Sequence, residues 1–152
     1  MSRRRLVLLV LVGLSASCNQ ETNKLFGSIS ELYPLDFTSV RIRKQQTDLV
    51  IDYLKEADRS VEKPCRLVVE TAELDIKPNV KIQAQLFTPS VHLSRVMVNG
   101  ETFPDITRGE LELKTYEFKG GGRVDGDFFI NFVNGRDLYG TFSGTVQEVV
   151  GE

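Results

Sequence analysis

Hydrophobic and polar residues alternate along most of the chain from about residue 25 onward. Leu49, Ile51 and Tyr53 illustrate the period of two, which recurs at 67–71 and 80–86. Such alternation, rich in β-branched residues, is typical of strands with one buried face. Groups of Pro, Gly and Asn residues interrupt the alternation and mark the turns between the predicted strands. The pattern predicts an all-β fold, an antiparallel β-sandwich or a small β-barrel of about eight strands.

Some segments carry competing signals. In residues 47–59, a Thr-Asp pair could cap a helix, but the β-forming residues that follow favour a strand. The prolines at Lys63-Pro64 and Thr88-Pro89-Ser90 predict breaks between strands. The alternation at 80–86 predicts another strand.

The segment 124–146 predicts a hairpin. Apolar residues alternate through 124–132 and again through 138–146, and Asn134-Gly135 between them favours a two-residue turn. A two-residue turn would place the two apolar sets on opposite faces of the sheet. We therefore predict an odd-numbered loop of three or five residues, with Phe132 opposite Leu138.

The inward face of this hairpin combines aromatic residues with glycines. The glycines could let the sheet curve and leave room for aromatic rings opposite them, which is the commoner arrangement. Alternatively, they could open a cavity for an apolar ligand. The candidate cavity or core-lining residues are Phe128, Phe132, Phe142, Gly140 and Gly144.

The N-terminal residues do not follow the strand pattern. Three arginines at positions 3–5 precede an aliphatic run at 6–14, and the small residues 15–17 lead to Cys18. A basic start, a short apolar run and a small-residue cleavage site define a secretory signal peptide. A transmembrane helix needs roughly 20 apolar residues, more than this run provides. We predict that residues 1–17 are removed.

Residues 14–18, Leu-Ser-Ala-Ser-Cys, resemble a bacterial lipobox. The resemblance implies cleavage before Cys18 and a lipid anchor on its thiol, with acyl chains such as palmitate. The large aliphatic residue stands one position earlier than in the usual pattern, with Ser15 in its place. Ordinary signal-peptidase cleavage of the same bond therefore stays open. Asn19 follows the cysteine, which by resemblance to enteric lipoproteins implies the outer membrane, at its periplasmic face or the cell surface.

The segment 18–24 is predicted to be a polar tether that begins at the lipidated Cys18. Residues 19–24 span at most about 20 Å, which would hold the domain, residues 25–152, close to the membrane. Removal of residues 1–17 takes away three arginines and no acid, so the net charge falls from −2 to −5. This acidic balance argues against a nucleic-acid partner. The one basic stretch, 41–44, alternates with apolar residues, as on a solvated strand face.

Three aspartates and two glutamates are candidates for metal binding or acid–base chemistry. Calcium needs six to eight oxygens from a defined loop, whereas Asp125 and Asp127 fall on the outward face of a predicted strand, with Asp137 nearby. Glu110 and Glu112 lie on one face of another predicted strand and could act as a general acid–base pair, but nothing in the sequence indicates a substrate cleft. We predict no metal site from these residues.

Cys18 and Cys65 are the two cysteines of the chain. With Cys18 lipidated, Cys65 is expected to be a small buried residue; with Cys18 unmodified, a Cys18–Cys65 disulfide becomes possible. The single histidine, His92, cannot build a metal site alone. We predict no enzymatic activity and no cofactor.

The predicted function is that of a membrane-anchored cell-envelope lipoprotein with a binding or structural β module. Its partner would be an envelope protein or a polysaccharide, and an exposed aromatic or apolar patch would support this. The alternative is a carrier of a hydrophobic small molecule or lipid in a barrel cavity. A hydrolase would require several acids gathered in one cleft.

The lipid anchor is open to a direct measurement. We expect the intact mass of the mature protein from a membrane fraction to match residues 18–152 plus acyl chains. An unmodified mass in the soluble fraction would instead indicate ordinary secretion and make the Cys18–Cys65 disulfide the next test.

Overall fold

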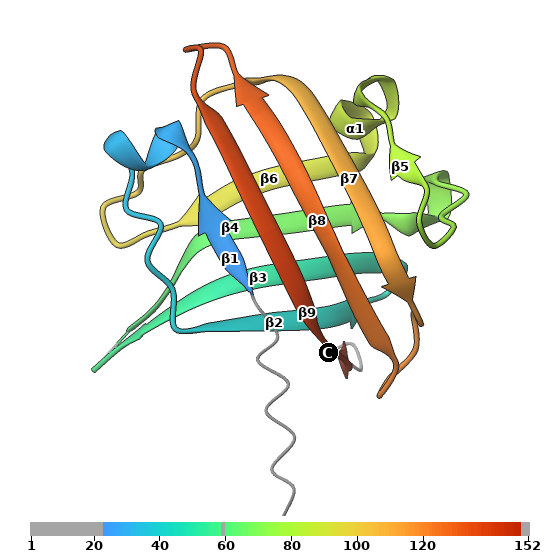
Figure 1. The fold of residues 1–152 in the computed structure, drawn as a ribbon. Coiled ribbons are helices and arrows are strands. Elements are labelled where there is room, and N and C mark those ends of the chain that lie inside the picture. Colours follow the sequence, from blue (N-terminus) through green and yellow to red (C-terminus); the bar gives the residue numbers. More distant parts are fainter. Residues whose placement is uncertain (1–22, 59, 150–152) are drawn as a thin grey trace, which may run out of the picture.

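The computed structural model describes residues 23–58 and 60–149, so Cys18 and the predicted signal peptide lie outside the described residues. These residues form an all-β fold with three short helical segments (Figure 1). The strands are β1 (Lys24–Phe26), β2 (Ser39–Gln45), β3 (Asp48–Ala57), β4 (Ser60–Glu70), β5 (Lys81–Ile82), β6 (Val91–Val96), β7 (Ile106–Tyr116), β8 (Arg123–Phe132) and β9 (Asp137–Val149). The helical segments are η1 (Ser28–Glu31), η2 (Thr71–Glu73) and α1 (Ala84–Ser90).

The strands form one curled sheet in the order β5-β7-β8-β9-β2-β3-β4-β6, with β1 added on β9. We call β5, β7, β8, β1 and the first part of β9 the front sheet, and β2, β3, β4 and β6 the back sheet; they cross each other in Figure 1. The long strand β9 belongs to both. Residues 137–145 pair with β8, and residues 146–149 run parallel to β2. The predicted all-β class is confirmed, and the curled sheet forms a half-barrel.

The opening of the half-barrel between β6 and β7 is covered by α1, where the alternation predicted a strand. That prediction is wrong beyond Ile82, because β5 ends there and Ala84–Ser90 is helical. Phe87 of this helix is fully buried, and its ring lies where a side chain on Gly109 of β7 would stand. Leu86, which fitted the alternation, is 55% exposed. The burial of Phe87 in a helix thus outweighs the preference for a strand that the period-two alternation indicates.

The back sheet confirms one sequence prediction and corrects another. Residues 48–57 form strand β3, as the β-forming residues favoured. Lys63-Pro64, however, does not separate two strands. It lies inside β4, where the register with both neighbouring strands shifts. A bulge is the place where a sheet tolerates a proline, because the missing N–H costs no regular ladder hydrogen bond.

The β8–β9 hairpin has an odd-numbered loop, as predicted, but a different register. Phe132 N–H donates to Arg136 O at 2.9 Å, so the loop contains three residues and ends at Gly135, whose φ is +78°. Leu138 pairs with Ile130 rather than with Phe132. Because the register moves by an even number of residues, the apolar faces stay aligned. The two-residue displacement changes which side chains face each other.

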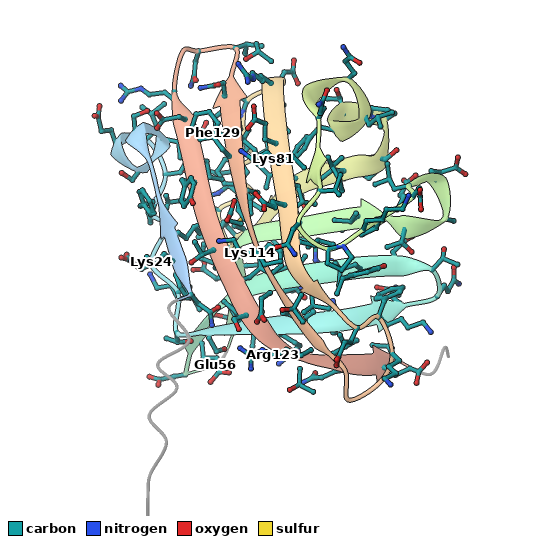
Figure 2. All side chains as sticks on the ribbon, turned by 45° about the vertical axis from the view of Figure 1, so that its right-hand side comes forward. Lys24, Glu56, Lys81, Lys114, Arg123 and Phe129 are labelled. Atoms are coloured by element: carbon teal, nitrogen blue, oxygen red, sulfur yellow. The ribbon has the colours of Figure 1, made fainter. Side chains whose placement is uncertain are left out.

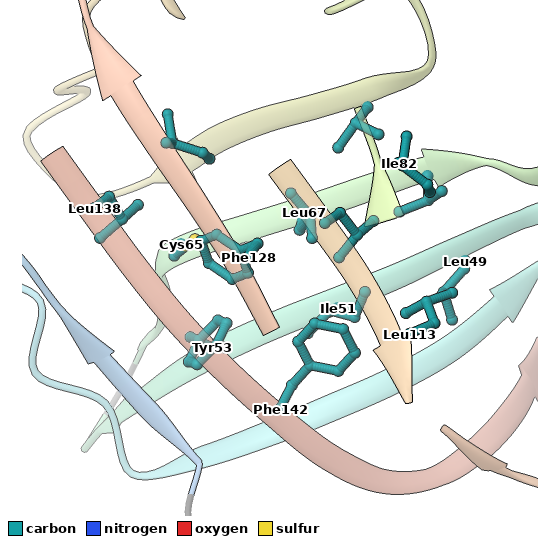
Figure 3. Close-up of a cluster of buried hydrophobic side chains, with 14 of the residues drawn as sticks. Leu49, Ile51, Tyr53, Cys65, Leu67, Ile82, Leu113, Phe128, Leu138 and Phe142 are labelled. Atoms are coloured by element: carbon teal, nitrogen blue, oxygen red, sulfur yellow. The ribbon is translucent and has the colours of Figure 1, made fainter. Parts of the chain in front are cut away.

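In this register, two of the three inner glycines of the hairpin stand opposite an aromatic ring, and the third, Gly144, stands opposite Val124. Phe128 pairs with Gly140, and Gly126 pairs with Phe142. A Cβ atom on Gly140 would lie 2.3 Å from the Phe128 ring, and one on Gly126 would lie 2.7 Å from the Phe142 ring. Figure 3 shows both rings in the core between the two sheets. The rings therefore occupy the volume that these glycines leave open.

Tyr53 of the back sheet completes this core. Its side chain is fully buried, and its hydroxyl donates to Thr141 O of β9 at 2.8 Å. Burial raises the pKa of Tyr53 well above its ordinary value, which keeps the hydroxyl protonated as a donor. One hydrogen bond thus joins the middle of the back sheet to the middle of the front sheet.

Two groups of side-chain interactions hold the segments that surround the half-barrel: hydrogen bonds to Asp137 and cation–π contacts of Arg95. Asp137 accepts hydrogen bonds from Ser28 N–H at 2.7 Å and from its hydroxyl at 2.8 Å, which holds η1 against β9. The buried guanidinium of Arg95 lies 4.9 Å from the Tyr33 ring centroid and 5.1 Å from that of Phe103. These cation–π contacts join β6 to the segment that follows η1 and to the segment that follows β6.

The aromatic–glycine packing predicts contrasting effects of two alanine substitutions on one strand. We expect Gly140→Ala to lower the free energy of unfolding by about 2 kcal/mol, because the new methyl group overlaps the Phe128 ring. Gly144→Ala is the matched control, since its Cβ would meet only the Ile42 side chain, whose Cδ1 would be 3.4 Å away; we expect it to be neutral or stabilising by up to about 1 kcal/mol. Chemical denaturation of both variants measures the difference, and equal effects would contradict the proposed packing.

Candidate binding face of the front sheet

Three aromatic side chains form a row across the outer surface of the front sheet. Tyr139 of β9 pairs with Phe26 of β1 on one side and with Phe129 of β8 on the other. The Phe26 and Tyr139 ring centroids are 4.9 Å apart, and Phe26 is 52% exposed. We call Phe26, Tyr139 and Phe129 the aromatic row. Aromatic residues aligned on an exposed sheet face are more typical of a contact surface than scattered apolar residues are.

The aromatic row continues into a polar groove at the β7 edge. Two adjoining pockets, of about 250 and 410 Å³, share Lys81 and Glu110. Figure 2 shows Phe129, Lys81 and Lys114 over this sheet. We call the two pockets together the outer groove. Its lining comprises Phe129, Tyr139, Glu112, Asp127 and Leu111 at the aromatic end and Gln83, Gln85 and Arg108 at the other.

The short strand β5 and the start of α1 build the far wall of the outer groove. β5 pairs with β7 so that Lys81 lies opposite Glu112, and its ammonium group is 3.6 Å from Glu110 Oε2. Gln83 follows directly as the N-cap residue of α1. Helix α1, which covers the opening of the half-barrel, therefore also places the side-chain amides of Gln83 and Gln85 at the groove, where they can donate and accept hydrogen bonds.

Two of the three carboxylates that line the outer groove form ion pairs with basic side chains. Glu110 accepts a hydrogen bond from Arg108, and Asp127 lies 2.8 Å from Lys114 Nζ. The hydrogen bond from Arg108, together with the charges of Arg108 and Lys81, lowers the pKa of Glu110. The hydrogen bond with Asp127 raises the pKa of Lys114. Both shifts favour the charged forms of Glu110 and Lys114.

The aspartates weighed as a calcium cluster have separate partners. Asp125 binds Arg123 and Ser143, whereas Asp137 binds Ser28 and Asp127 binds Lys114. Among residues 23–58 and 60–149, no group of three or more His, Cys, Asp or Glu side chains is placed to hold a metal ion. Glu110 and Glu112 do lie on one face, as the alternation predicted, and both line the outer groove.

The cavity or core-lining candidates lie on the inner side of the sheets. Phe128, Phe132 and Phe142 are at most 2% exposed and belong to the hydrophobic core. Cys65 is also buried in this core as a free thiol, and burial raises its pKa, so it is held as a neutral thiol. His92 lies on β6, exposed, with Nε2 2.6 Å from Glu70 Oε1. None of these residues borders the outer groove.

The aromatic row had a signal in the sequence that the core pattern obscured. In β8, Phe129 lies between Phe128 and Ile130, so it is an apolar residue at an outward position. Tyr139 is the corresponding outward residue of β9. Phe26 stands outside any alternating segment, so only the pairing of β1 with β9 brings it to the row.

Comparison with protein-family models, with curated proteins and with solved structures finds no match. None of the helices in the described part of the chain is long and apolar enough to cross a membrane.

The charge state of Glu110 gives a direct test of the groove electrostatics. We expect Arg108→Gln to raise the pKa of Glu110 toward its ordinary value, because the variant loses the charged donor that holds the carboxylate. Carboxyl-carbon NMR titration measures the shift, with Lys119→Gln as a surface control that leaves it unchanged. A wild-type Glu110 pKa already above the ordinary value would contradict this account.

Proposed function

We propose that this chain is a membrane-anchored cell-envelope lipoprotein whose β domain is a non-catalytic binding module for polysaccharide. The observation that carries the proposal is the aromatic row continuing into the outer groove. An aromatic ring offers an apolar face to the C–H groups of a sugar. Carboxylates, amides and cations beside it offer acceptors and donors for the hydroxyl groups.

The charge pattern of the groove supports binding rather than hydrolysis. Glycoside hydrolysis requires a carboxylic acid that keeps its proton until it donates to the leaving group, and its pKa is accordingly raised. The pKa of Glu110 is lowered by Arg108 and Lys81 instead. A carboxylate fixed in this state accepts hydrogen bonds well and donates a proton poorly.

The inner core gives no comparable support to the carrier alternative. A carrier of an apolar ligand needs space inside the half-barrel. The volumes beside Gly126 and Gly140, where the inner glycines would open a cavity, hold the Phe142 and Phe128 rings. An extended ligand is better accommodated by the outer surface.

The lipid anchor enters the proposal from the sequence resemblance. Cys18, as the first residue of the mature chain, would carry the lipid and place the domain in the cell envelope, at the outer membrane. The described chain begins at Asn23, whose side chain accepts a hydrogen bond from Ser143 N–H at 2.7 Å, and Lys24 already belongs to β1. The predicted tether therefore joins the front sheet directly.

The test is polysaccharide binding by the full chain and by variants of the aromatic row. We expect the wild type to co-sediment with purified peptidoglycan sacculi or to be retarded in gels containing extracted surface polysaccharide. Tyr139→Ala and Phe129→Ala should each weaken binding roughly fivefold to tenfold, because each removes a stacking face worth about 1 kcal/mol.

Val133→Ala is the control for this test, since Val133 is 60% exposed in the β8–β9 loop and lies off the row. It should bind like the wild type, and all variants should keep the wild-type thermal unfolding transition. The proposal fails if neither polysaccharide binds, or if the row variants bind as tightly as the control.

A further inference from the structure

The outward side of the back sheet contains a carboxylate that is fully buried. Asp52 of β3 points away from the inner core, between Val50 and Leu54, and the three residues are 0%, 3% and 1% exposed. Val50 and Leu54 are not part of the core between the sheets. A strand in the middle of an outer face is this well covered only when long side chains from its neighbours lie over it.

Two arginines from the strands on either side cover Asp52. Arg43 Nη2 of β2 lies 2.8 Å from Asp52 Oδ2, and Arg66 Nε of β4 lies 2.6 Å from Oδ1. Burial alone would raise the pKa of Asp52, but the hydrogen bond and charge of Arg66 and the charge of Arg43 lower it. Asp52 is thus ionised and orients both guanidinium groups over the sheet.

The cations around Asp52 outnumber it. Arg41 of β2 and Lys63 of β4 flank the same carboxylate, which gives this area four cations and one anion. We call Arg41, Arg43, Lys63 and Arg66 the basic face. Within the described residues, neither Arg41 nor Lys63 forms a salt bridge. The acids at outward positions of β3 and β4 lie toward the ends of the strands: Asp48 is opposite Glu70, which also binds His92, and Glu56 lies at the other end of β3.

The excess charge of the basic face is not neutralised within the described chain. Partial burial lowers the pKa of Lys63, and the charges of Arg66, Arg43 and Arg41 lower it further, against the opposing effect of Asp52. Arg43 Nε is buried with no hydrogen-bond partner. An external anion near these groups would relieve the repulsion among them.

We propose that the basic face docks on an anionic phospholipid surface. The cations are spread over the outer surface of β2 and β4, on both sides of Asp52 of β3, rather than gathered in one pocket, which suits a surface of many phosphate groups. Clustered Lys and Arg residues near a membrane are attracted by anionic headgroups. The predicted tether, residues 19–24, reaches at most about 20 Å, so a lipidated chain would hold the domain at the membrane surface. The docking surface is independent of the outer groove.

The test measures binding to vesicles that differ only in headgroup charge. The full chain carrying Cys18→Ser, which has no site for the lipid, is mixed with vesicles of phosphatidylcholine alone or with phosphatidylglycerol added. Residues 1–17, with the apolar segment 6–14 and the arginines at positions 3–5, are common to the parent and to every variant. The contribution of the basic face is therefore the difference between the parent and the variants on anionic vesicles. We expect clearly tighter binding to the anionic vesicles, decreasing as salt is added.

The basic face is tested with Arg41→Gln plus Lys63→Gln, which leaves the Asp52 contacts of Arg43 and Arg66 in place. Each lost cation should weaken anionic-vesicle binding about fivefold, and the pair about 25-fold. Lys77→Gln plus Lys119→Gln is the control, because it removes the same charge from loops and should bind like the parent. Thermal unfolding of both double variants shows that the fold is retained.

Three results would overturn the proposal. The first is equal binding to neutral and anionic vesicles, and the second is an equal loss of binding in both double variants. The third is binding to soluble polyphosphate that depends on Arg41 and Lys63 while anionic vesicles do not bind, which would assign the basic face to a soluble polyanion. None of these results affects the polysaccharide test, which uses different residues and a different probe.

Discussion

The interlocking of aromatic rings and glycines across the β8–β9 pair is the constraint on which the rest of the structure depends. Phe128 occupies the space that Gly140 leaves, and Phe142 occupies that of Gly126. Protein cores are packed about as densely as organic crystals, so this match selects one register among those that keep the apolar faces aligned. Tyr53 then reaches across the core to Thr141 O. The spacing of the two sheets follows from these contacts.

The two sheets give the domain two chemically different outer surfaces. On the front sheet, acids and cations neutralise one another beside an aromatic row, which leaves a surface suited to uncharged polar ligands. On the back sheet, one buried carboxylate orients a group of cations that outnumbers it. Because β9 runs through both sheets, the surfaces keep a fixed relative orientation. A domain docked through the basic face would present the aromatic row away from the lipid.

The sequence predicted the positions of the strands better than the register between paired strands. Alternation correctly indicated strand β3 and the odd-numbered β8–β9 loop, because both depend on which side chains share a face. It missed the register, which depends on matching side-chain volumes between strands. It also missed α1, where Phe87 packs against Gly109 and overrides the local period. Asp52 was not identified because a polar residue at an outward position normally faces solvent. The lipid anchor on Cys18 stays a prediction, since it falls outside the described residues.

The position of β9 also affects the order of folding. β1 and β2 lie near the start of the described chain, yet both pair with β9, as Leu25 with Gly140 and Ile42 with Val146 show. Such long sequence separations make folding slow, because a large loop must close before the contacts form. A chain that emerges gradually from a ribosome or a membrane channel therefore cannot join its two sheets until residues 137–149 are free. Until then, the edges of β1, β2 and β8 remain open to proteases and to other chains.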